Sequence, residues 1–189
     1  MRSGFFRRIL AIAVLVLAIP ALSGFTFKGE KIDKRYYRIY GASHAELVKA
    51  VRRNAPRNGR AYGLGIIDFF PSYQTERKDG SCRVKKAEVG LRVQLRLPRW
   101  HGNKQVPRRV LRIARNFERV INAHEMQHVR IARRYTRLMK QRLLKMPAEK
   151  SCWTLRSNTR AMIRDLKKQH IWAHRRFDNR TRKQIRRLL

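Results

Sequence analysis

Two histidines four positions apart, His124 and His128, enclose Glu125 in a segment that could bind a metal ion. On a helix, residues four apart lie one above the other, so both imidazoles can reach the same ion. Glu125 would lie about 100° further round the helix, where its carboxylate can take a proton from water. This spacing is typical of zinc hydrolases. It predicts Zn²⁺ as the cofactor, His124 and His128 as metal ligands and Glu125 as the catalytic residue. The alternative is a pair of core histidines bonded to their neighbours.

A catalytic zinc site needs a third protein ligand, because three protein groups leave one position for water. The C-terminal part of the chain offers His170 and His174, again four apart, and then Asp178. Glu149 is a fourth candidate, since a glutamate on a later helix is a common third ligand in zinc peptidases. Taken singly, His170 and His174 also fit the role of polar residues on a packed helix. The residue pattern leaves all four candidates open.

A long amphipathic helix is predicted to carry the histidine pair. From about residue 107 to residue 144, apolar side chains recur at helical spacing on one stripe, and His124 and His128 fall within that stripe. A break is expected near Pro147. A second long helix is predicted from about Ser151 towards the C-terminus, and it carries three of the candidate third ligands.

The residues ahead of these helices have the patterns of strands and one short helix. Strands are predicted over residues 31–40, 64–73 and 89–97, and the last of these alternates strictly between apolar and polar side chains. A short helix is predicted to begin after Ser43 and to end at Pro56. We therefore expect an α+β fold that is zincin-like, with a small antiparallel sheet and one short helix, followed by two long helices.

Charge is the most unusual feature of the composition. The 189 residues include 47 Lys and Arg but 12 Asp and Glu, which gives a formal net charge of +35. Hydrophobic residues make up 43% of the chain, enough for a sizeable core, so the composition argues against disorder. The charge predicts a polyanionic partner or polyanionic surroundings. In a cytosolic protein it would favour nucleic acid, because Lys and Arg neutralise phosphates whatever the base sequence.

The N-terminal segment argues against a cytosolic location. Residues 1–23 have the order of a secretory signal peptide: Arg7 and Arg8 precede an apolar run over residues 9–22, and small residues follow. An uncleaved membrane anchor is the alternative, because no charge occurs between Arg8 and Lys28.

We therefore expect residues 24–189 to form one exported domain, periplasmic or secreted. The partners expected there are a protein or peptide substrate and anionic polymers of the cell envelope, whereas nucleic acid is disfavoured. Membrane contact is expected only through the N-terminal segment. The sequence does not indicate an oligomeric state.

The two cysteines of the chain, Cys82 and Cys152, fit an oxidising compartment in which they can pair. The alternative is two separate buried thiols.

The chain resembles a bacterial family of unknown function whose members are described as secreted zinc-dependent proteases with the His-Glu-x-x-His motif. The resemblance covers nearly all of the chain after the signal peptide, in order. It implies a zinc metallopeptidase with His124 and His128 as ligands, Glu125 as the catalytic residue and a Cys82–Cys152 disulfide. The matching segments are residues 40–42, 80–84, 97–100, 123–128, Cys152 and 177–181.

The chain departs from this family pattern near its C-terminus. The family has a Thr followed by His-Gly, whereas this chain continues from Thr181 with Arg182, Lys183 and Gln184. If the family histidine is the third ligand, then His174, His170 or Asp178 must replace it here, or the site is degenerate.

Two functions follow from these observations. The first is an exported zinc-dependent metallopeptidase that hydrolyses peptide bonds. The alternative is a catalytically degenerate, cationic envelope protein that binds anionic polymers.

Overall fold

The computed structural model describes residues 29–102 and 105–189. The predicted signal peptide or anchor, residues 1–23, lies outside the described residues. Among the described helices, none combines the length and the apolar character needed to cross a membrane. The elements are, in chain order, β1 (Glu30–Ile39), α1 (His44–Asn54), β2 (Leu64–Lys78), β3 (Ser81–Trp100), α2 (Arg108–Leu144) and α3 (Cys152–Arg186).

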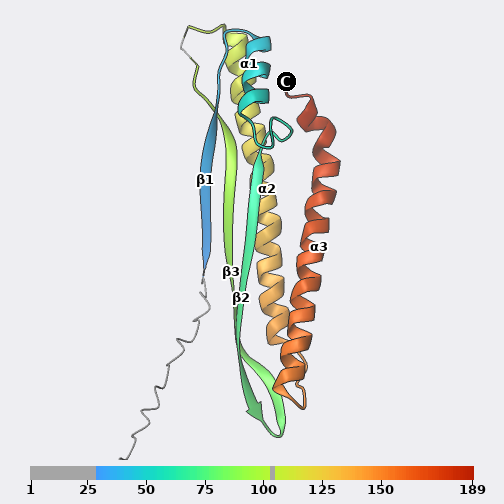
Figure 1. The fold of residues 1–189 in the computed structure, drawn as a ribbon. Coiled ribbons are helices and arrows are strands. Elements are labelled where there is room, and N and C mark those ends of the chain that lie inside the picture. The colour runs from blue at the N-terminus through green and yellow to red at the C-terminus, as the bar shows by residue number, and fades with distance from the viewer. Residues whose placement is uncertain (1–28, 103–104) are drawn as a thin grey trace, which may run out of the picture.

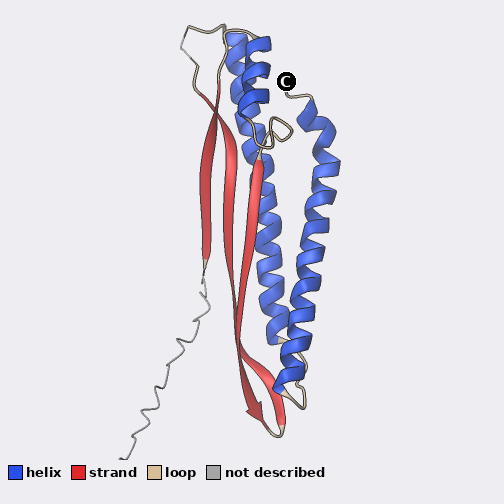
Figure 2. Cartoon of the chain, viewed as in Figure 1, coloured by secondary structure: helices blue, strands red, loops and turns tan. Residues whose placement is uncertain are grey.

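The fold is α+β, with a three-stranded sheet on one side and the two long helices on the other (Figures 1 and 2). Helix α2 packs on the sheet, and α3 returns antiparallel beside α2 (Figure 1). The prediction of one short helix followed by two long ones is confirmed. Together α2 and α3 bring residues some 50 positions apart in the chain to the same level, which is what a metal site shared between them requires.

The sheet is mixed, so the prediction of an antiparallel sheet was wrong. Its order is β1-β3-β2, with β2 antiparallel to β3 but β1 parallel to it. The physical reason is the connection through α1: the chain turns back after β1 and runs down β2, and the β2–β3 hairpin reverses it again. Strand β3 therefore runs in the same direction as β1. Strand β1 pairs with the edge of β3 that faces away from β2. Alternation of side chains reports which face is buried, but it does not report strand direction.

The alternating segment of β3 supplies the core beneath α2. Its apolar side chains from Val89 to Leu97 are buried, and they meet Val129, Met139 and Leu143 of α2. A second cluster of buried side chains, around Leu47 of α1 and Phe117 of α2, packs the N-terminal half of α2. With both ends packed, α2 is held firmly at the level of the histidine pair.

A disulfide joins Cys82 at the start of β3 to Cys152 at the start of α3, so the pairing expected for the two cysteines is present. Beside it, the backbone of Cys82 exchanges hydrogen bonds of 2.7 and 2.9 Å with Glu149. The bridge fixes the beginning of α3 against the sheet. It thereby helps to set the position of α3 alongside α2.

Replacing both cysteines by serine is expected to lower the free energy of unfolding by about 4 kcal/mol, because the bridge closes a loop of 70 residues in sequence separation and restricts the unfolded chain. Urea unfolding of the variant and of the parent protein, followed by circular dichroism, measures the difference. A loss below about 1 kcal/mol would contradict this role of the bridge.

Candidate metal centre

Three side chains from the two long helices converge on one point. His124 and His128 project from α2, and their Nε2 atoms lie 3.2 Å apart. Asp178 of α3 places its Oδ1 3.2 Å from His124 Nε2 and 2.9 Å from His128 Nε2. Of the four candidates for a third ligand, Asp178 is therefore the one whose carboxylate reaches both histidines.

The spacing of these three atoms fits a zinc ion. In tetrahedral zinc sites with metal–ligand bonds near 2.0–2.1 Å, neighbouring ligand atoms are about 3.3 Å apart. The observed separations are 3.2, 3.2 and 2.9 Å. Two imidazole nitrogens and one carboxylate oxygen are also a ligand set that zinc accepts readily.

The hydrogen bonds of His124 are compatible with a metal ion at this point. Thr181 Oγ1 donates a hydrogen bond to the carbonyl of Phe177 at 3.0 Å, and it lies 3.4 Å from His124 Nδ1. Thr181 can therefore accept the Nδ1 proton of His124, so Nε2 either carries a second proton, which it donates to Asp178, or offers a lone pair to a metal cation held together with Asp178. A lone pair and a carboxylate at this distance repel each other unless a proton or a metal cation lies between them.

Glu125 lies beside the three converging side chains and is 5% exposed. One of its carboxylate oxygens and the ligand nitrogens of His124 and His128 lie within 4.8 Å of one another, so this cluster could hold a metal. Burial raises the pKa of the Glu125 carboxyl, although the nearby histidines oppose the shift. A carboxylate whose pKa is raised accepts protons more readily, as a general base should.

Gly63 makes room for the Glu125 carboxylate, and Gly65 lies in contact with it. A Cβ atom on Gly63, just before β2, would collide with Glu125 Oε1, and one on Gly65 would lie 3.4 Å from Oε2. The segment before β2 can therefore pass close to the carboxylate only because Gly63 lacks a side chain, whereas a Cβ on Gly65 would only touch it.

The two other candidate histidines, His170 and His174, lie on α3 beside the ring of His128 and do not converge with the three side chains. His174 stacks on His128 with ring centroids 4.6 Å apart, and His170 packs against His174 at 4.1 Å. Burial, assisted by neighbouring imidazoles, lowers the pKa of His174 to about 3 and that of His170 to about 4, so both are neutral at pH 7. The Nε2 atoms of both, and Nδ1 of His128, are buried without a hydrogen-bond partner among the described residues.

The remaining candidate, Glu149, is not brought to the centre. It pairs with the backbone of Cys82, and its side chain accepts a hydrogen bond of 2.8 Å from Asn158. These contacts place it beside the disulfide at the start of α3, whereas Asp178 lies in the C-terminal half of that helix.

Asp178 is ionised in this setting. Burial alone would raise its pKa, but hydrogen bonds from His124 and His128 outweigh that effect and hold the pKa of Asp178 below its usual range. The group facing the two imidazoles at neutral pH is therefore an anion.

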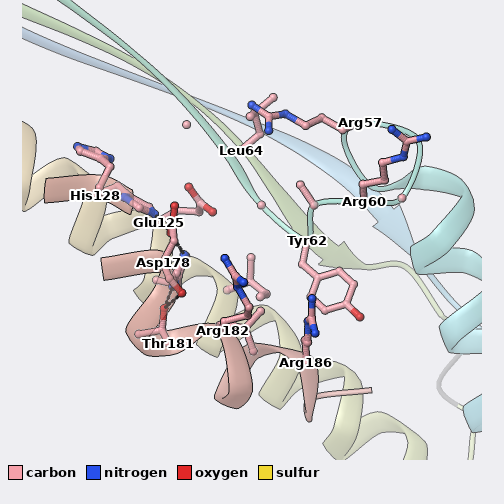
Figure 3. A pocket seen from close by; sticks show the side chains of 18 of the residues that line it. Arg57, Arg60, Tyr62, Leu64, Glu125, His128, Asp178, Thr181, Arg182 and Arg186 are labelled. Carbon is pink, nitrogen blue, oxygen red and sulfur yellow. Dashed lines mark hydrogen bonds and ion pairs between the residues drawn. The ribbon is translucent and has the colours of Figure 1, made fainter. Parts of the chain in front are cut away.

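The centre opens into a cavity of about 500 Å³ between the start of β2 and the C-terminal half of α3 (Figure 3). Its walls include His124, Glu125, His128 and Asp178. The four side chains that could carry metal chemistry are therefore accessible to a ligand of moderate size.

A comparison with protein families places the chain. The model of the family described as "Bacterial protein of unknown function (DUF922)" matches residues 34–184. The chain belongs to the DUF922 family. The matched DUF922 region contains His124, Glu125, His128, Asp178 and both cysteines. No curated protein and no solved structure matches the chain.

The residues that converge at this candidate centre were all named from the sequence, but two neighbours, Thr181 and Gly63, were given no role there. Thr181 has a detectable signal, because it lies three residues after Asp178 and so on the same helix face. Gly63 has none, since only the folded structure brings β2 against Glu125.

Proposed function

We propose that this protein is a zinc-dependent hydrolase that cleaves peptide bonds. The observation that carries the proposal is the convergence of His124 Nε2, His128 Nε2 and Asp178 Oδ1 within 3.2 Å of one another, beside the buried Glu125. Two histidines and a carboxylate with an adjacent glutamate form a recurrent set of groups in zinc peptidases.

The metal-holding residues in this proposal are His124, His128 and Asp178. Zinc at such a centre supplies Lewis acidity, which polarises a carbonyl group and makes water acidic near neutral pH. Thr181 orients His124 through Nδ1, and the ring of His174 supports His128 from behind. Both contacts limit the movement of the ligands, which favours metal binding.

Glu125 takes the part of the proton carrier. Its carboxylate removes a proton from the attacking water and then delivers it to the nitrogen of the leaving amine, so that the peptide bond breaks without a charged amide leaving group. The raised pKa of the buried carboxyl brings it closer to the pH at which it works.

The position of β2 favours a peptide as the substrate. Strand β2 is an edge strand of the sheet, and its residues Leu64, Gly65 and Ile67 line the cavity beside Glu125. An extended peptide can pair with the backbone of an edge strand. Such a peptide would pass directly over the metal centre. We further propose that the protein works in the periplasm or outside the cell, as its N-terminal sequence predicts.

Removal of the metal is expected to abolish hydrolysis of an unfolded protein substrate such as reduced casein, and one equivalent of Zn²⁺ should restore it. The test is release of new amino termini before chelation, after dialysis against a chelator, and after zinc is added back. Hydrolysis that survives complete removal of the metal would refute a zinc-dependent reaction.

Binding of anionic envelope polymers is the second candidate function, and the net charge of +35 favours it. In this alternative the side chains of the centre keep their arrangement, but the protein catalyses no reaction there. Replacement of Glu125 by Gln separates the two functions, because it should stop hydrolysis and leave polyanion binding intact.

A further inference from the structure

Four arginines gather at one end of the cavity beside the metal centre. Arg57 and Arg60 belong to the loop between α1 and β2, and Arg182 and Arg186 rise from α3 on the opposite side (Figure 3). Within the part of the chain that the structure describes, the carboxylates that line the cavity are those of Glu125 and Asp178. Over residues 29–102 and 105–189, none of the four arginines forms an ion pair. This end of the cavity therefore carries positive charge that the protein itself does not neutralise.

The arginines of α3 are placed at regular steps from the metal centre. Arg182 and Arg186 follow Asp178 at intervals of four residues, so all three lie on one face of the helix. Their backbones are about 6 and 12 Å from that of Asp178 along the helix axis. Arg182 donates one hydrogen bond, of 2.6 Å, to Asn179 Oδ1. Its remaining N–H groups are available to a ligand.

The arginines of the loop are held by an unusual backbone. Arg57, Asn58 and Gly59 have φ angles of 54°, 56° and 79°, three successive residues in the left-handed region. Two of them carry side chains, which makes this conformation costly. A Cβ on Gly59 would collide with the carbonyl of Arg52, so the loop lies tightly against α1. The amide of Arg60 donates to the Arg57 carbonyl at 3.2 Å, which closes the turn.

We propose that the substrate is an acidic peptide whose carboxylate side chains lie about two and four residues from the scissile bond, on one side of it. This inference rests on the proposed peptidase function. Side chains on the same face of an extended peptide are spaced by about 6.6 Å, which matches the steps from Asp178 to Arg182 and Arg186. The planar guanidinium group of arginine binds carboxylates through two hydrogen bonds. The opposite end of the cavity is lined by Ile67 and His174, so it offers no arginine.

Three peptides of equal length test the proposal: one with Glu two and four residues before the scissile bond, one with Glu at the same distances after it, and one with Gln at all four positions. For each peptide, kcat/KM is measured with the zinc-loaded protein, and affinity is measured with the Glu125→Gln variant by fluorescence anisotropy. One of the two acidic peptides is expected to be cleaved and bound at least about tenfold better than the Gln peptide.

Matched variants separate a specific site from the general positive charge. In the double variant Arg182→Gln/Arg186→Gln, the preference for the acidic peptide should disappear. The control Arg137→Gln/Arg142→Gln removes two exposed arginines of α2 outside the cavity, so it has the same net charge, and it should keep the preference. An equal loss in both double variants would assign the preference to the whole surface and would overturn the proposal.

Two further outcomes would also overturn it. In the first, all three peptides have the same kcat/KM and the same affinity. In the second, a DNA oligonucleotide of equal charge binds more tightly than the acidic peptide, and that binding is lost only in Arg182→Gln/Arg186→Gln. If no peptide is cleaved although zinc is bound, the peptidase function fails. In that case the affinities alone decide whether the cavity selects acidic peptides.

Discussion

Replacement of Glu125 by Gln is expected to lower kcat for peptide hydrolysis by a factor on the order of 10²–10⁴, the usual contribution of a general acid–base group. Glutamine has the same shape as glutamate, so it can fill the space that Gly63 leaves beside β2. It cannot take a proton from water. Zinc content and polyanion binding should stay largely unchanged, because the three proposed ligand atoms belong to other residues.

A matched control is Glu88→Gln, which makes the same chemical change at an exposed residue that pairs with Lys140 on the surface. This control should keep its activity, since exposed ion pairs contribute little. If Glu125→Gln hydrolysed peptides at the rate of the parent protein, Glu125 would have no catalytic role. If neither the parent protein nor Glu125→Gln hydrolysed any peptide, but both bound polyanions in a salt-sensitive manner, the binding function would be favoured instead.

Asp178→Asn is expected to weaken zinc binding by more than about 100-fold, since changes to groups that only support the ligands already cost 10–100-fold. The amide keeps the size of the carboxylate but removes the negative charge that faces His124 and His128. Competition with a chromogenic zinc chelator measures the affinity of each variant.

The comparison variant is His174→Phe, which preserves a flat ring against His128 but removes the ring nitrogens. It should weaken zinc binding by less than about 100-fold, because His174 is expected to support a ligand rather than to be one. The reverse pattern, tight binding in Asp178→Asn and loss in His174→Phe, would make His174 the third ligand and would contradict the geometry assigned to Asp178.

Local patterns in the sequence predicted the elements that carry the centre. The strict alternation from Val89 to Leu97 identified a strand with one buried face, and the stripe containing His124 and His128 identified the long helix. Both signals are periodic, and periodicity is set by backbone geometry alone. The Ser43 cap likewise predicted α1, and its side chain accepts a hydrogen bond from the Glu46 amide at 3.3 Å.

Long-range relations could not be predicted in the same way. The direction of β1 depends on how the chain returns through α1, which leaves no trace in the pattern of β1 itself. Asp178 could not be separated from His170, His174 and Glu149, because the choice depends on how α3 is aligned along α2. That alignment depends on tertiary packing and on the Cys82–Cys152 bridge. The left-handed conformation of the loop that presents Arg57 could not be predicted for a similar reason, because it depends on how the loop packs against α1.

The zinc content of the purified protein tests the central claim most directly. Elemental analysis after gel filtration in metal-free buffer should find about one equivalent of zinc per chain, because a formed three-ligand site holds its metal through such a step. The double variant His124→Ala/His128→Ala, purified in parallel, should contain almost none. Less than about a tenth of an equivalent in the parent protein, with no uptake when zinc is supplied, would contradict the existence of the metal centre.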